Sequence, residues 1–135
     1  MDTEPGKSAR IVIVDDHPIV RLGMRLLLDN VPGLSVCGEA DSMLSALDAV
    51  NALKPDLVIV DLAIGDGDGL DLIRRLHITD PHLPVVVFSI YEEETFAEVT
   101  FMAGARGYVM KSEAPGALIE TIHRVLAATD NPPAR

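Results

Sequence analysis

The sequence has no tryptophan, one cysteine and few aromatic residues of any kind. Because aromatic residues make up only 4% of the chain, a folded core has to be built from aliphatic side chains. The single cysteine, Cys37, excludes a disulfide bond within the chain and is typical of a reducing compartment. We interpret its thiol as a small core hydrophobe and not as a reactive group.

Basic residues are also scarce, since 11 lysines and arginines stand against 21 acidic residues and the net charge is −10. Binding to nucleic-acid phosphates requires a basic surface, so we do not expect this chain to bind nucleic acid directly. No apolar run approaches the roughly 20 residues of a membrane-spanning helix. The polar start, MDTEPGKSAR, lacks the apolar core of a signal peptide. We therefore expect a cytoplasmic protein without membrane contact.

Hydrophobic residues form 48% of the chain and charged residues 24%, which is typical of one folded domain at a length of 135 residues. We expect this domain to cover residues 10–128. Residues 1–9 are predicted to be a flexible polar lead, and residues 129–135 (TDNPPAR) a linker-like tail.

Short apolar runs recur along the chain and predict five strands. Residues 11–14, 57–60 and 85–88 do not alternate with polar residues, which is typical of parallel strands covered on both faces. Residues 34–40 alternate more clearly and predict an edge strand, and residues 107–110 form a short fifth run. Apolar residues at helical spacing predict a helix after each strand.

The alternation of strands and helices predicts an α/β fold with a doubly wound, five-stranded parallel sheet and helices on both faces. The expected strand order is the flavodoxin-like 2-1-3-4-5. At the helix starts, Asp16 is predicted to cap the first helix and Ser42 the second.

Polar residues stand at the ends of four strands of this predicted sheet. They are Asp15 and Asp16 after the first strand, Asp61 after the third, Ser89 at the end of the fourth and Lys111 after the fifth. Parallel strands bring their carboxyl ends to one edge, where ligands bind in open sheets. Carboxylates gathered there repel one another without a cation, and Mg²⁺ prefers such oxygen ligands. A nearby hydroxyl and ammonium suit phosphoryl transfer to an aspartate.

These motifs together resemble the receiver domains of two-component response regulators. The matching segments are IVDDHPIVRLGMRLLL, PDLVIVDL, VVFSI and AGARGYVMKS, and the resemblance covers about residues 10–126. The DDHP opening and the GARGYVMK segment are further similar to the NarL/FixJ (LuxR-type) subfamily, whose receivers usually precede a helix-turn-helix domain.

The resemblance implies a role for each residue at the predicted edge. Asp61 would be the phosphoacceptor. Asp16 would bind Mg²⁺ (or Mn²⁺) directly, Asp15 mainly through water, and the backbone carbonyl of Ala63 would be a further ligand beside Asp61.

Three more residues would serve the phosphoryl group and the conformational switch. Lys111 would pair with one phosphoryl oxygen, and Ser89 would donate a hydrogen bond to another. Tyr108 stands at the position of the family's switch aromatic, which turns inward as the serine moves to the phosphate.

The implied phosphodonor is a histidine kinase, for which acetyl phosphate often substitutes. Dimerisation on activation and control of transcription through a C-terminal DNA-binding domain outside this chain are also implied. Catalysis would be limited to slow hydrolysis of the domain's own phosphoryl group. Two departures stand out, since Gly65 and Ser112 occupy positions where the wider family commonly has proline.

Two other functions fit the sequence less well. A doubly wound hydrolase or nucleotide-binding enzyme is disfavoured because no G-x-G-x-x-G or P-loop motif follows the first strand. The adjacent acids also differ from the D-x-D of haloacid-dehalogenase phosphatases. A stand-alone or phosphorylation-independent receiver-like interaction module is the remaining alternative, although such a module would be expected to have lost an acid or the lysine.

Overall fold

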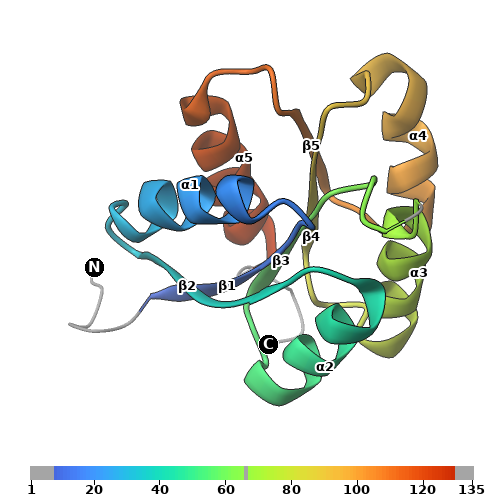
Figure 1. The fold of residues 1–135 in the computed structure, drawn as a ribbon, viewed down its shortest axis with the longest axis horizontal. Coiled ribbons are helices and arrows are strands. Elements are labelled where there is room, and N and C mark those ends of the chain that lie inside the picture. Colours follow the sequence, from blue (N-terminus) through green and yellow to red (C-terminus); the bar gives the residue numbers. More distant parts are fainter. Residues whose placement is uncertain (1–7, 66, 130–135) are drawn as a thin grey trace.

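The computed structural model describes residues 8–65 and 67–129 (Figure 1). Its strands are β1 (Ala9–Val14), β2 (Leu34–Ala40), β3 (Leu57–Val60), β4 (Val85–Ser89) and β5 (Gly107–Met110). Its helices are α1 (Pro18–Asp29), α2 (Met43–Leu53), α3 (Gly69–Thr79), α4 (Glu93–Ala103) and α5 (Pro115–Thr129). Residues 1–7 of the predicted polar lead and residues 130–135 of the predicted tail lie outside the described part of the chain.

The five strands form one parallel sheet in the order β2-β1-β3-β4-β5, which confirms the predicted topology. Helices α1 and α5 cover one face of the sheet, and α2, α3 and α4 cover the other (Figure 1). Residues 11–14 of β1 and all four residues of β3 are apolar and buried, as expected for strands covered by helices on both faces.

Successive residues of each inner strand enter opposite layers of the core, as the period of two along a strand requires. Ile11, Ile13 and Ile59 pack with α1 and α5, in a layer that includes Leu28 and Ile122. The other layer, under α2, α3 and α4, takes the intervening valines of β1 and β3 together with residues such as Ala46, Leu72, Ile73 and Tyr108. The sheet therefore separates two aliphatic layers.

The register of the sheet sets the height of the acidic residues. Val14 of β1 is paired with Val60 of β3, so Asp15 and Asp61 leave the sheet at the same level. The Asp61 N–H donates to the carbonyl oxygen of Val14 at 3.0 Å, which continues the ladder past the last paired residues. The two aspartates are thus held by backbone hydrogen bonds at neighbouring strand ends.

The prediction that Asp16 caps α1 is wrong. The N-cap residue is His17, without a capping side-chain hydrogen bond, and Pro18 occupies the first turn, where a missing N–H is tolerated. The carboxylate of Asp16 instead accepts a hydrogen bond from the Gly65 N–H at 3.3 Å, 49 positions further along the chain. By contrast, Ser42 caps α2 as predicted, in a reciprocal capping box with Ser45.

Cys37 is partly buried in β2 and packs against the layer under α2, and this burial raises the pKa of its thiol. That environment agrees with a packing role. In the described part of the chain, every helix is too short or too polar to cross a bilayer.

Candidate functional site

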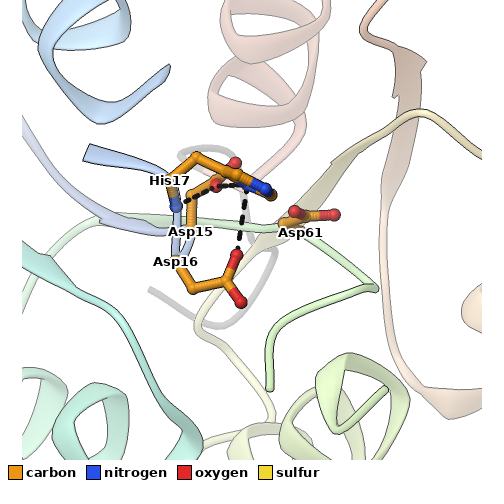
Figure 2. A group of neighbouring side chains, drawn as sticks. All are labelled: Asp15, Asp16, His17 and Asp61. Carbon is orange, nitrogen blue, oxygen red and sulfur yellow. Dashed lines mark hydrogen bonds and ion pairs between the residues drawn. The ribbon is translucent and has the colours of Figure 1, made fainter. Parts of the chain in front are cut away.

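The acidic residues predicted from the sequence come together at the carboxyl edge of the sheet. Asp15, Asp16 and His17 follow β1, and Asp61 follows β3 (Figure 2). Each residue has one side-chain oxygen or nitrogen atom in a cluster whose atoms all lie within 4.8 Å of one another. The side chains of Asp15 and Asp61 are both only 2% exposed, whereas that of Asp16 is 33% exposed. Two of the three carboxylates are therefore almost fully removed from water.

Lys111, which follows β5, extends between the two buried carboxylates. Its Nζ donates to Asp15 Oδ2 at 2.7 Å and to Asp61 Oδ2 at 3.2 Å. Burial alone lowers the pKa of this ammonium, but the carboxylates of Asp15 and Asp61 outweigh that effect and raise the pKa above its ordinary value. Lys111 thus remains charged and joins two neighbouring strand ends through one ammonium group.

The charges at this edge do not cancel. Three carboxylates lie at this edge, and among the described residues Lys111 is the one lysine or arginine that pairs with any of them. Asp16 Oδ1 is buried and, among the residues that the structure describes, accepts no hydrogen bond of good geometry, although His17 Nδ1 lies 3.1 Å away. An excess of negative charge and a buried carboxylate oxygen without a hydrogen bond fit a divalent cation with oxygen ligands, such as Mg²⁺ or Mn²⁺.

The loop after β3 lies close to Asp61 and is shaped by glycines. The Ala63 N–H donates to Asp61 Oδ1 at 3.1 Å, so each oxygen of this carboxylate has a partner. Gly65 has a φ of 55°, a left-handed conformation that disfavours most other residues. A Cβ at Gly69 would lie 2.7 Å from the carbonyl oxygen of Asp61. The loop can approach Asp61 only because Gly69 has no side chain.

Ser89, Tyr91 and Tyr108 form a second group beside the acids. Ser89 is fully buried, and its Oγ accepts a hydrogen bond from the Tyr91 N–H at 3.2 Å. The Tyr108 hydroxyl donates to the Tyr91 carbonyl oxygen at 2.9 Å, and burial raises the pKa of this phenol. The predicted switch residues Ser89 and Tyr108 are therefore both bonded to the main chain of Tyr91.

Sequence reasoning missed several residues around this site. Phe88 lies under the Lys111 ammonium, 5.9 Å from the ring centroid, and Tyr91 serves through its backbone. Arg21 donates to the carbonyl oxygen of Asp15 at 2.6 Å. The sequence signal for this contact is Glu39, an acidic residue near the end of β2, which pairs with Arg21 of α1.

The departures from the family pattern leave the site assembled. Gly65 takes part through its N–H, which donates to Asp16. The peptide bond between Lys111 and Ser112 is trans. Neither position removes a chemical group from the cluster, and all the side chains predicted at this edge are present at it.

Residues 11–123 match the family described as the response regulator receiver domain. The response regulator GacA of Pseudomonas viridiflava is 36% identical over 118 residues, which are 87% of this chain and 55% of that protein. The nitrate/nitrite response regulator protein NarL of Escherichia coli K12 is 31% identical over 121 residues, or 90% of this chain and 56% of that protein. The chain thus spans about half the length of these relatives.

A similar solved structure is that of a LuxR-family two-component response regulator from Aurantimonas sp. SI85-9A1. It superposes with a TM-score of 0.86 at 37% identity and covers 90% of this chain and 87% of that one. The family match extends over most of the chain, and GacA, NarL and the LuxR-family structure are each more than 30% identical to it. The chain therefore belongs to the receiver domains of two-component response regulators, of the type found in NarL and GacA.

Proposed function

We propose that this receiver domain accepts a phosphoryl group on Asp61 in a reaction that depends on Mg²⁺ or Mn²⁺, and that phosphorylation switches its conformation. The observation that carries the proposal is the environment of Asp61. Its carboxylate is almost fully buried, lies beside that of Asp15, and shares the ammonium of Lys111 with it. An aspartate held in this way is fixed in position for nucleophilic attack.

The metal would be held by the carboxylates of Asp16 and Asp61 and the carbonyl oxygen of Ala63, with Asp15 acting mainly through water. The buried Oδ1 of Asp16, which accepts no hydrogen bond from the described residues, supports this assignment. A bound divalent cation supplies positive charge that offsets the repulsion between the carboxylates and an incoming phosphoryl group.

In the proposed reaction, a carboxylate oxygen of Asp61 forms a bond to phosphorus. The bond between phosphorus and the donor's imidazole nitrogen breaks, and its electron pair stays on that nitrogen, which then takes a proton. Lys111 would stabilise one phosphoryl oxygen, and the Ser89 hydroxyl would donate to another. Lys111 Nζ already lies 3.2 Å from Asp61 Oδ2, and Ser89 is buried at the end of β4, the strand next to β3.

The switch would run through Ser89 and Tyr108. When Ser89 turns to the phosphoryl group, its hydroxyl gives up the hydrogen bond from the Tyr91 N–H. The loop that contains Tyr91 and leads to α4 then moves. Tyr108 keeps its ring buried beside this loop. The face formed by α4, β5 and α5 would therefore differ between the two states, and a phosphoryl group shifts the balance by its differential affinity for them.

Receiver domains act with histidine kinases and are phosphoacceptors, not dedicated catalysts. For this chain we propose a histidine kinase as donor, slow hydrolysis of its own aspartyl phosphate, dimerisation on activation and a cytoplasmic location. Because the relatives GacA and NarL are about twice as long as the matched region, the proposed output is transcription through a DNA-binding domain beyond it.

The direct test is the intact mass after incubation with acetyl phosphate and Mg²⁺. We expect a gain of one phosphoryl group, which is lost with Asp61→Asn and in a sample treated with chelator. Retention of the gain in Asp61→Asn would assign the phosphoryl group to another residue and overturn the proposal.

A titration with beryllofluoride separates the remaining alternatives. Binding of this mimic without uptake from acetyl phosphate would indicate a working acid pocket that requires its own kinase. Absence of both would favour an interaction module that works without phosphorylation.

A further inference from the structure

Arg21, in the second turn of α1, links three elements through one guanidinium group. Its Nη1 donates to the main-chain carbonyl oxygen of Asp15 at 2.6 Å, and its Nε donates to Glu39 Oε1 at 2.9 Å. The Arg21 side chain is 18% exposed, so these bonds are largely shielded from water. A long and otherwise mobile side chain is thereby fixed at both ends of its guanidinium group.

Glu39, near the end of β2, is itself held by two arginines. Its second oxygen accepts from Arg25 Nε at 2.7 Å. Burial alone would raise the pKa of this carboxyl, but the hydrogen bonds from Arg25 and Arg21 lower it below its ordinary value. Glu39 is therefore ionised at neutral pH and gives Arg21 a fixed anionic partner.

The carbonyl oxygen that Arg21 binds belongs to the peptide group between Asp15 and Asp16. The N–H of Asp15 is already bonded to the carbonyl oxygen of Ala40 at 3.0 Å. With its carbonyl also bonded, Asp15 is held on both sides, and the plane of the next peptide group is fixed. That plane sets the directions in which both aspartate side chains leave the backbone.

We propose that Arg21 is a positioning residue for the acid pair, which holds the Asp15–Asp16 peptide group in the orientation that metal binding requires. The inference rests on the proposed function, because it concerns the same acids. Arg21 makes no contact of its own with the carboxylates of the pair in the described structure; it acts through the backbone.

The chain offers a matched control for a purely structural role. Arg25 lies one turn further along α1, binds the same Glu39 carboxylate and also approaches Asp29 Oδ2 at 3.9 Å. Unlike Arg21, it makes no contact with Asp15 among the described residues. If the ion pairs with Glu39 serve only to dock α1 against β2, the loss of either arginine should have the same effects.

The experiment measures the affinity for Mn²⁺ from the free-ion signal in electron paramagnetic resonance, together with the urea midpoint, for the unaltered protein, Arg21→Ala and Arg25→Ala. We expect Arg21→Ala to weaken Mn²⁺ binding by about tenfold or more, the usual effect of removing a residue that orients metal ligands through a hydrogen bond. Arg25→Ala should stay within about twofold, while both variants lower the urea midpoint. Equal Mn²⁺ affinities for the two variants would overturn the proposal.

Two further variants keep the test decisive if Arg21→Ala folds poorly. Arg21→Lys keeps one donor and should recover part of the affinity. Glu39→Gln leaves the Arg21 contact with Asp15 but weakens its anchor, so it should fall between Arg21→Ala and the unaltered protein. Absence of Mn²⁺ binding by the unaltered protein would instead remove the proposed metal site itself, whereas normal binding with unaffected Arg21 variants would remove this inference alone.

Discussion

The phenolic hydroxyl of Tyr108 donates to the main-chain carbonyl oxygen of Tyr91 at 2.9 Å, and this bond joins strand β5 to the loop between β4 and α4. The N–H of the same residue, Tyr91, donates to the Ser89 hydroxyl. The main chain of Tyr91 is therefore bonded both to Ser89 at the end of β4 and to Tyr108 in β5. A movement of Ser89 toward a phosphoryl group must therefore alter the bonding of the segment to which Tyr108 is attached.

Replacement of Tyr108 by phenylalanine keeps the ring and removes this hydrogen bond. We expect a loss of about 1 kcal/mol in the free energy of unfolding, the usual net value of one hydrogen bond. Tyr108→Ala also removes the buried ring and should lose about 3–5 kcal/mol. Urea unfolding measures both, and phosphoryl uptake should persist in Tyr108→Phe. Equal losses in the two variants would show that the ring contributes nothing beyond its hydroxyl.

Replacement of Lys111 by methionine leaves the buried carboxylates of Asp15 and Asp61 without their ammonium. In the presence of a chelator, we expect a loss of about 3–5 kcal/mol in the free energy of unfolding, as for other broken buried ion pairs. Saturating Mg²⁺ should reduce this loss because the cation offsets the same charges. The double variant Lys111→Met with Asp15→Asn should regain part of the stability. A loss that Mg²⁺ leaves unchanged would contradict the proposed metal site.

Replacement of Gly69 by alanine puts a Cβ against the backbone of Asp61 and Leu62, neither of which can turn away. We expect a loss of about 1–3 kcal/mol in stability, as for other overpacked positions, and slower phosphoryl uptake because the loop beside Asp61 must shift. Gly116→Ala is the control, since its Cβ would meet nothing within 4 Å in α5. It should gain about 0.5–1 kcal/mol from helix propensity. Similar effects of the two substitutions would argue against the close approach.

Glu39 should make the stability depend on pH in the acidic range. Because its folded pKa is lowered by Arg25 and Arg21, its contribution is present above its unfolded pKa of about 4.3 and is lost as the pH falls through the folded value. Glu39 is partly solvated, so the contribution should be about 1 kcal/mol or less. Urea unfolding of the unaltered protein and Glu39→Gln should differ at neutral pH and converge once the pH falls below the folded pKa of Glu39. A constant difference across this range would contradict the assignment.

The sequence was sufficient to predict the fold and the principal side chains of the site. Asp15, Asp61 and Lys111 were predicted because apolar runs locate the strand ends, and parallel pairing brings strand ends to one edge. Those inferences need only local patterns and the usual handedness of the connections between strands. The same reasoning placed Ser89, which ends β4.

The remaining features depend on contacts that no local pattern encodes. Asp16 was predicted to cap α1, but the N–H of Gly65, from a loop far along the chain, takes its carboxylate instead. Arg21 could be recognised only once β2 was known to bring Glu39 beside α1. Tyr91 acts through its main chain, which any residue could supply, so its type carries no signal.

The sheet keeps the side chains packed under α1 and α5 apart from those packed under α2, α3 and α4. A change of side-chain volume in one layer reaches the other only through the strand backbones, so substitutions on opposite sides and more than about 10 Å apart should be additive within about 0.5 kcal/mol. Substitutions in the layer under α1 and α5 can therefore alter that side of the molecule while the packing around Tyr108, in the opposite layer, stays as it is.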